Sequence, residues 1–403
     1  MIKNIKASGL LSFGPKGIDL PLLPLNVLIG ANGSGKSNLL EVINLFREAP
    51  SPGRSLSGPI MDAGGIDEWL WKGDWKMDGN AYPARLECVV DGGQGSDMRH
   101  TITFFGQRHS LKLDDETIEP AKPNERGEKW WYYRWLNSKK ALHAAFHDWE
   151  FDGEDDDSGI RYVPHADLDY SASILAQVRD PGRYKVFEHL QKQYASMELY
   201  RNWSFGPHSP IRNPARSDER QDRLGRSVQN LAVVIAAMDG RTRKKLVSAL
   251  QTLYPGIEGV SARPVAGGAL QLYLEEEGGI EVSAARLSDG TLRYLALLVI
   301  LLDPNPPPLI AIEEPELGMH PDVIPKLAEL LIDASERTQL VVTTHSRMLV
   351  DCLQLVPESI VVCEKHDGES SFERLDRIRM EAWLEIFSLG ELWSKGELGG
   401  NRW

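Results

Sequence analysis

The chain has 403 residues, which is enough for one large domain with an insertion or for two ordinary domains. Its 45 Lys and Arg against 58 Asp and Glu give a formal net charge of −13, which argues against nucleic-acid binding over the whole surface. The three cysteines, Cys88, Cys352 and Cys363, lack CxxC spacing, which argues against a disulfide framework or a zinc ribbon and favours buried thiols.

No segment of the sequence predicts a membrane span. The longest apolar run, 295–302, is less than half of the roughly 20 residues that a membrane helix needs. Lys3 and Lys6 interrupt the first apolar residues and no small-residue cleavage site follows, so we expect no secretory signal. These observations predict a cytoplasmic protein without membrane contact.

The first part of the chain, 1–115, alternates short strands with one helix. Residues 1–20 predict two strands around a turn at 14–17, and the apolar run 25–29 is typical of a central parallel strand. A glycine-rich loop leads from this run into a predicted helix from about Lys36 to Arg47. Alternating apolar residues between 81 and 113 predict further strands, which form an antiparallel lobe.

The middle part, 116–255, is predicted to be a mainly helical insertion. Segments 174–200 and 224–253 have mostly helical spacing, and a Pro- and Gly-rich stretch at 206–214 separates them. In the last part, 256–403, strands resume at 270–274, 309–312, 340–343 and 360–363, with helices between them. The sequence therefore predicts an α/β head formed by 1–115 and 256–403, interrupted by the insertion.

A phosphate-binding loop is predicted between the apolar run 25–29 and the following helix. Residues 30–37 are a complete G-x-x-x-x-G-K-S match, in which glycines let backbone N–H groups point at phosphate oxygens beside a helix N-terminus. We expect Lys36 to bridge the β- and γ-phosphates and Ser37 to hold Mg²⁺. The predicted nucleotide-binding residues are Gly30, Ala31, Asn32, Gly33, Ser34, Gly35, Lys36, Ser37 and Asn38.

Carboxylates and a histidine follow two of the later strands. Glu313 and Glu314 end the run 309–312, and we assign Glu313 to the Mg²⁺ shell and Glu314 to the attacking water. His345 follows the run 340–343, where it is expected to contact the γ-phosphate or the water. The alternatives are a solvated turn for the Glu-Glu-Pro sequence and an ordinary loop position for the histidine.

A second helix N-terminus carries the sequence Leu287-Ser288-Asp289-Gly290-Thr291, about 20 residues before the two glutamates. Ser288 and the Gly290 amide would there be able to bind an anion. The alternative is an ordinary Ser or Asp N-cap.

In this order, the four elements resemble the heads of ABC-, SMC- and RecF-type ATPases, most closely the stand-alone bacterial predicted ATPases of that group. Their Walker A loop looks like 30–37, their signature like 287–291, their Walker B like 309–314 and their H-loop histidine like His345. The resemblance implies a P-loop NTPase fold with a mixed sheet, ATP and Mg²⁺ as cofactors, and Lys36, Glu314 and His345 as catalytic residues. It also implies a homodimer on ATP binding, in which the signature of one copy caps the ATP of the other.

Two positions depart from these relatives. Glu313 stands where many carry Asp, and Asp289 stands where transporters carry Gly, which places a negative charge near the γ-phosphate unless Asp289 caps the helix. Hydrolysis is therefore expected to be slow. Gln94 and Gln107 are candidates for the Q-loop glutamine, and Arg54 is a candidate for the arginine that SMC heads place after the Walker A helix.

The insertion carries a local excess of basic residues. Between positions 179 and 245 lie 14 Lys and Arg against 7 Asp and Glu. The densest group is proposed to contact DNA or a partner, with a solvated helical surface as the alternative; it comprises Arg212, Arg216, Arg220, Arg223 and Arg226. The aromatic residues within 130–135 favour core packing or a partner surface over stacking on bases.

Two functional hypotheses follow. The first is an ATPase that dimerises around ATP and drives or gates a DNA-associated process, repair or antiphage defence, with a separately encoded effector. The second is an ATP-gated regulatory scaffold with negligible turnover that recruits a protein partner.

Overall fold

The computed structural model describes residues 1–73, 76–77, 80–81, 83–93, 96–123, 131–136, 143–147, 160–164, 168–178, 184–201 and 203–400. The chain forms two compact units. Unit 1 comprises Met1–Leu23, Gly30–Met197 and Val362–Glu373, and unit 2 comprises Pro24–Ile29, Glu198–Val361 and Arg374–Trp403. The segment 116–255, predicted as one insertion, is thus divided between the two units.

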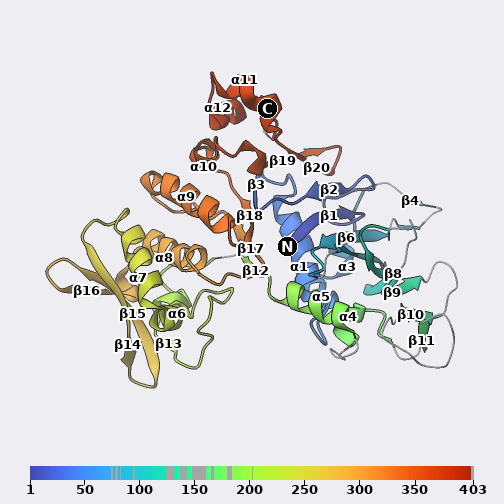
Figure 1. The fold of residues 1–403 in the computed structure, drawn as a ribbon, viewed down its shortest axis with the longest axis horizontal. Coiled ribbons are helices and arrows are strands. Elements are labelled where there is room, and N and C mark those ends of the chain that lie inside the picture. Colours follow the sequence, from blue (N-terminus) through green and yellow to red (C-terminus); the bar gives the residue numbers. More distant parts are fainter. Residues whose placement is uncertain are drawn as a thin grey trace. The chain divides into compact units, whose positions relative to one another are not determined.

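An antiparallel sheet of eight strands is the framework of unit 1, in the order β11-β10-β9-β8-β7-β6-β1-β2 (Figure 1). This sheet confirms the predicted antiparallel lobe. Its strands are β1 (Ile2–Ser8), β2 (Ile18–Pro21), β6 (Ala84–Val90), β7 (Met98–Gln107), β8 (Ser110–Pro120), β9 (Tyr133–Leu136), β10 (His143–His147) and β11 (Ile160–Pro164). A separate small pair is formed by β4 (Lys76–Met77) and β5 (Asn80–Ala81).

Five helices accompany this sheet in the described part of unit 1. They are α1 (Lys36–Glu48), α2 (Ser57–Asp62), α3 (Ile66–Trp69), α4 (Ile174–Gln177) and α5 (Lys185–Ala195). Helix α1 was predicted at this place, and its apolar residues Leu39, Ile43 and Phe46 are fully buried. The burial of one face against the core fixes the orientation of the loop that precedes the helix.

Four parallel strands form the centre of unit 2, in the order β12-β17-β18-β3. They are β3 (Leu25–Ile29), β12 (Glu198–Tyr200), β17 (Leu309–Glu313) and β18 (Gln339–Thr343). Every residue of β3 and β18 is buried, as expected of strands covered on both faces. The prediction of helix for 198–200 is wrong, because these residues pair with β17 along the edge of the sheet.

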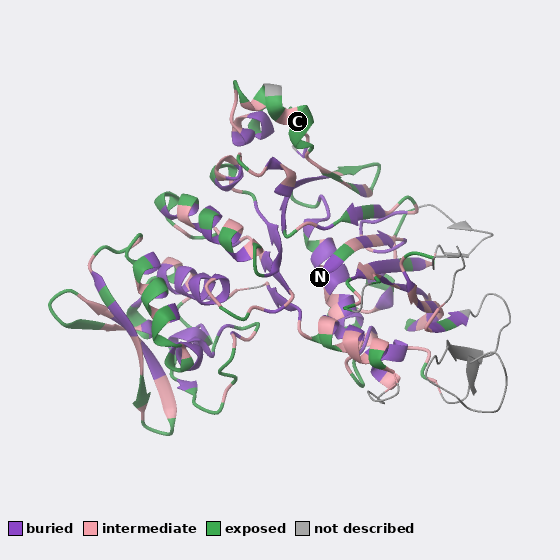
Figure 2. Cartoon of the chain, viewed as in Figure 1, coloured by how far each residue is buried: buried purple, intermediate pink, exposed green. Residues whose placement is uncertain are grey.

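The helices next to these strands are α8 (Asp289–Leu301), α9 (Ile324–Ser335) and α10 (Arg347–Cys352). Helix α8 is buried along most of its length, as Figure 2 shows. The chain continues through β19 (Ile360–His366), β20 (Glu369–Arg374), α11 (Arg377–Leu384) and α12 (Leu389–Ser394).

A second, antiparallel sheet in unit 2 contains β13 (Ala215–Arg216), β14 (Ile257–Val265), β15 (Ala269–Glu276) and β16 (Ile280–Ser283). Helix α6 (Leu231–Ala237) packs against β14 and β15, and α7 (Gly240–Leu250) packs against β14 and α8. The described part of 116–255 thus contains β9 to β13 as well as helices. The sequence did not predict these strands, because short strands are held by main-chain pairing that side-chain periodicity does not reveal.

Among the residues that the structure describes, no helix combines the length and the apolar character needed to cross a bilayer. The three cysteines all lie in the described part of the chain and form no disulfide. Cys88 and Cys363 are buried, as predicted, whereas Cys352 is only partly buried; burial raises the pKa of the Cys88 thiol to about 12.

Candidate nucleotide site

The glycine-rich loop of unit 1 needs glycine for its positive φ angles and, at some positions, for close packing. Gly30, Gly33 and Gly35 all have positive φ angles, of 148°, 80° and 99°. A Cβ on Gly30 would lie 2.1 Å from the Cys363 carbonyl oxygen, and one on Gly35 would lie 2.4 Å from Ser370 Oγ. A Cβ on Gly33 would have no neighbour within 4 Å. The loop is therefore packed at Gly30 and Gly35 and faces open space at Gly33.

Two polar groups of this loop are suited to bind phosphate. The Lys36 side chain is buried, and its Nζ donates to the carbonyl oxygens of Gly30 at 2.8 Å and Ala31 at 2.9 Å. Ser34 is also buried, and its Oγ has no hydrogen-bond partner among the described residues. A polyphosphate would provide an anionic partner for both, so this part of the predicted site fits its ligand.

A small cluster of side chains supports the loop from behind. Asn38 Nδ2 and Ser370 Oγ each donate to Ser12 Oγ at 2.7 Å, and the Ser370 amide donates to the Ser12 carbonyl at 2.8 Å. Asn38, predicted as a nucleotide-binding residue, thus places its amide side chain on Ser12. The sequence did not reveal Ser12 and Ser370, because isolated serines carry no motif.

In unit 2, Glu314 and His345 come together at the ends of neighbouring parallel strands. Glu314 follows β17 with a φ of 45°, a left-handed conformation that is uncommon for a residue with a side chain. Its amide donates to the Thr343 carbonyl at 3.0 Å, which fixes the corner against β18. His345 Nε2 lies 3.4 Å from Glu314 Oε1, and both side chains are about one-third exposed.

Glu316 holds the backbone of this histidine. Its Oε1 accepts from the Thr344 hydroxyl at 2.5 Å and from the His345 amide at 3.1 Å. Burial raises the pKa of the Glu316 carboxyl above its ordinary value. The sequence does not reveal this role, because Glu316 is one of three glutamates within four residues.

Glu313, assigned to Mg²⁺, is ion-paired within unit 2: Arg201 Nε lies 3.1 Å from its Oε2. The Ser37 hydroxyl of unit 1 and this carboxylate are both oxygen donors, which Mg²⁺ prefers. Within the described ranges, no group of three or more His, Cys, Asp or Glu side chains is arranged to hold a metal. An oxygen donor of either kind suits a cation that takes its other ligands from phosphates and water.

The signature sequence begins α8. Ser288 is the N-cap, and its Oγ accepts from the Thr291 amide at 3.1 Å, so the capping interpretation is correct for Ser288. A Cβ on Gly290 would lie 2.8 Å from the Gly318 carbonyl oxygen, and Leu287 is buried. In front of this helix end is a pocket of about 410 Å³ lined by Leu253, Tyr254, Ser288, Gly290, Thr291, Tyr294, Gly318, Met319, His320, Pro321 and Val323.

The five arginines predicted to contact DNA or a partner differ in their surroundings. Arg212 is buried and binds the signature region instead of facing solvent. Arg216 is exposed and pairs with Asp218 at 2.6 Å, and Arg226 is exposed. Arg220 pairs with Asp222 at 2.7 Å and with Glu198 at 2.8 Å. This placement disfavours a DNA contact for Arg212.

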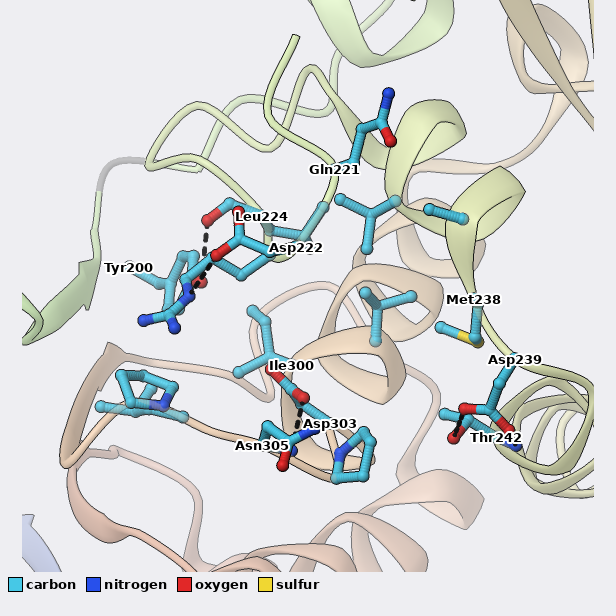
Figure 3. A pocket seen from close by; sticks show the side chains of 17 residues that line it. Tyr200, Gln221, Asp222, Leu224, Met238, Asp239, Thr242, Ile300, Asp303 and Asn305 are labelled. Carbon is cyan, nitrogen blue, oxygen red and sulfur yellow. Dashed lines mark hydrogen bonds and ion pairs between the residues drawn. The ribbon is translucent and has the colours of Figure 1, made fainter.

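Arg223, the fifth of these arginines, lines a second cavity of about 490 Å³ at the C-terminal end of α8 (Figure 3). Apolar side chains such as Leu224, Val234 and Ile300 form much of its wall. Asp303 also lines it, accepting from the Asn305 amide at 2.8 Å, and burial raises the pKa of the Asp303 carboxyl. Among the described residues of the Walker A, Walker B and signature segments, Ile310 of the Walker B strand lines this cavity and the others do not.

The remaining candidates have ordinary surroundings or lie outside the described residues. Arg54 Nη2 pairs with Asp62 at 2.5 Å, and Gln107 is exposed at the end of β7. Gln94 and Trp130 lie outside the described residues. Tyr133 and Trp135 are buried, which agrees with core packing.

Comparison with known protein families tests the predicted fold. A family model described as "AAA domain, putative AbiEii toxin, Type IV TA system" matches residues 25–351. The chain belongs to this family. The matched range of this AAA-domain protein includes the glycine-rich loop, the signature, both glutamates and His345. Among curated proteins, none matches the chain.

Two solved structures of SMC heads cover nearly the whole AAA-domain protein. An SMC head bound to the C-terminal winged-helix domain of ScpA has a TM-score of 0.55 and 15% identity, over 94% of this chain and 99% of that chain. A Pyrococcus furiosus SMC head with an extended coiled coil, bound to the C-terminal domain of ScpA, has a TM-score of 0.53 and 16% identity, over 95% and 98%. At this identity the likeness concerns the fold. The AAA-domain protein therefore has the P-loop NTPase fold of SMC heads, as the sequence predicted.

Proposed function

We propose that this protein binds ATP with Mg²⁺ at the loop 30–38, that ATP binding joins two copies, and that the joined copies hydrolyse it. The observation that carries the proposal is the pair of Glu314 and His345, with 3.4 Å between Oε1 and Nε2. The left-handed backbone at Glu314 costs about 1–3 kcal/mol, and such strain persists chiefly at functional sites.

Each side chain has one role in this mechanism. Glu314 orients the attacking water and accepts its proton, while His345, held through its amide by Glu316, contacts the water or the γ-phosphate. Lys36 moves from the loop carbonyls to the phosphate oxygens. Ser37 and Glu313 would provide oxygen ligands for Mg²⁺, and the ion would add positive charge at the phosphate oxygens.

The signature is proposed to complete the site of a second copy. Ser288, Gly290 and Thr291 line an accessible pocket at the N-terminus of α8, where an anion is favoured by the helix dipole. If each nucleotide is shared by two copies of a homodimer, the resting protein lacks a complete catalytic site. ATP would then act as the switch that assembles it.

For the process that this switch serves, we favour antiphage defence or DNA repair with a separately encoded effector. The family description refers to a toxin–antitoxin system, and both SMC heads are bound to another protein in their structures. The exposed residues Arg216 and Arg226, with the half-exposed Arg220, are the candidates for DNA contact. Salt-sensitive binding is expected, because such contacts release counterions.

One observation favours the alternative, an ATP-gated scaffold with negligible turnover. Arg201 occupies the Glu313 carboxylate at 3.1 Å and so competes with the metal ion for it. A scaffold would bind ATP and dimerise but release little phosphate.

The test is light scattering of Glu314→Gln with ATP and Mg²⁺, with Lys36→Ala as the variant that cannot bind ATP. We expect Glu314→Gln to accumulate as a dimer and Lys36→Ala to stay monomeric and fail to bind a fluorescent ATP analogue. A strictly monomeric Glu314→Gln protein that binds ATP would refute the shared site. Multiple-turnover phosphate release by the wild type, measured with and without DNA at two salt concentrations, separates the ATPase from the scaffold.

A further inference from the structure

Arg212 connects the segment before β13 to the signature. It ends a short 3₁₀ helix, η2 (Pro210–Arg212), and its side chain is 9% exposed, although arginine is among the residues most often found at the surface. All of the contacts described below lie within unit 2. A buried guanidinium needs partners for its five N–H donors.

The guanidinium of Arg212 is surrounded by acceptors on two sides. On one side Nε donates to the Phe205 and Gly206 carbonyls, both at 3.0 Å. On the other side Nη1 donates to Leu287 at 2.7 Å and to the carbonyls of Ala284 and Ala285 at 3.2 and 3.3 Å. These last three residues lead directly into Ser288.

The remaining nitrogen, Nη2, donates to Asp289 Oδ1 in an ion pair. Asp289 is the residue whose negative charge is unusual for a signature that approaches a γ-phosphate. Ser288 is the N-cap of α8, so the Asp289 carboxylate is not used for capping and is held by Arg212. Ser288, Gly290 and Thr291 line the pocket in front of α8, whereas Asp289 is not among the described residues that do so.

We propose that Arg212 is a positioning residue for the signature: it fixes the chain at 284–287 and compensates the Asp289 carboxylate, so that α8 accepts the nucleotide of a second copy. This role rests on the ATP-bridged dimer proposed above. It also gives the segment 206–214 a function in the ATPase cycle. A movement of that segment that displaces Arg212 would leave the Asp289 carboxylate without its ion pair and the carbonyls at 284–287 without their hydrogen bonds.

The test uses the Glu314→Gln background, in which the ATP-bound dimer accumulates, and compares Arg212→Gln with Arg212→Gln/Asp289→Asn. We expect Arg212→Gln to weaken ATP-dependent dimerisation about tenfold, since a charge-assisted hydrogen bond of this kind contributes about one decade in an equilibrium constant. The double variant should recover most of this loss, because it removes the uncompensated charge. A merely structural role would not produce this recovery. Binding of a fluorescent ATP analogue by the monomer, measured at protein concentrations too low for dimerisation, should be unchanged, since the glycine-rich loop lies in the other unit.

Arg263→Gln is the matched control, because Arg263 is an arginine of the same unit, 46% exposed, that pairs with Glu281 and Glu275 away from the signature. Equal weakening by Arg263→Gln and Arg212→Gln, or no recovery in the double variant, would overturn the proposal. If Glu314→Gln does not dimerise, the proposed function fails. Hydrogen exchange of the amides at 284–291 then decides whether Arg212 holds the signature region in place. Faster exchange in Arg212→Gln alone supports its hold on the signature region, and unchanged exchange refutes it.

Discussion

The glycines of the phosphate loop permit a quantitative test with a matched pair of substitutions. Gly33→Ala and Gly35→Ala each place a Cβ at a positive φ, which costs about 1–2 kcal/mol. At Gly33 the new Cβ has no neighbour within 4 Å, so this backbone strain is the whole effect. At Gly35 it lies 2.4 Å from Ser370 Oγ and 2.7 Å from Ser12 Oγ, and relieving such overpacking costs about 1–3 kcal/mol more.

The assay is thermal unfolding, followed by circular dichroism, together with binding of a fluorescent ATP analogue. At about 2–4 °C per kcal/mol, Gly33→Ala should lower the midpoint by about 2–8 °C and Gly35→Ala by about 4–20 °C. Gly35→Ala/Ser370→Ala should recover part of the loss, whereas Gly33→Ala/Ser370→Ala should not. Gly33→Ala should nevertheless lose nucleotide affinity, because its methyl group enters the open space. Equal losses of stability at the two glycines would refute this account of the loop.

Three further predictions concern unit 2. Ser288→Ala should lower the free energy of unfolding in urea by about 1 kcal/mol, because it removes the α8 N-cap. Ser288→Thr keeps a hydroxyl and should retain most of that stability, so equal losses in the two variants would contradict the capping role. Because burial raises the native pKa of Glu316, its contribution to stability is fully present below the unfolded pKa and falls as pH rises through the native value. Glu316→Gln should therefore flatten the dependence of the unfolding free energy on pH above about 4.5, and an unchanged slope would count against a buried acid. Arg201→Ala should lower the Mg²⁺ concentration needed for half-maximal ATP hydrolysis, since the guanidinium no longer competes for Glu313; Arg263→Ala is the control, and an identical Mg²⁺ dependence would exclude competition.

The sequence predicted the elements whose residues satisfy local rules. The strand 25–29, the glycine-rich loop and helix α1 follow one another in the chain, so their pattern is visible in a single window. The runs that became β17 and β18 are apolar because both faces of a central parallel strand are covered. The sequence assigned Glu314 and His345 separately, and the structure brings them together because the ends of neighbouring parallel strands meet at one edge of a sheet.

The sequence could not predict the residues that act through distant contacts. The strand β12 has only three residues and is held by pairing with β17, so the prediction of a helix there is wrong. Without this strand, nothing in the sequence indicates that Arg201, the residue after it, lies beside Glu313. Arg212 was grouped with its neighbours as a basic surface, because composition does not reveal which arginine finds buried carbonyls. Ser12 and Ser370 meet behind the loop although they are 358 positions apart.

The order of strands in unit 2 has a consequence for synthesis on the ribosome. Asn26 of β3 donates to the carbonyl of Leu340 in β18, a partner 314 residues further along the chain. At about 5–20 residues per second, the first of these strands waits about 15–60 s for its neighbour to be translated. Throughout that time an apolar strand with an unpaired backbone edge is available to other chains. The nascent polypeptide should therefore depend on chaperones more strongly than the finished protein does.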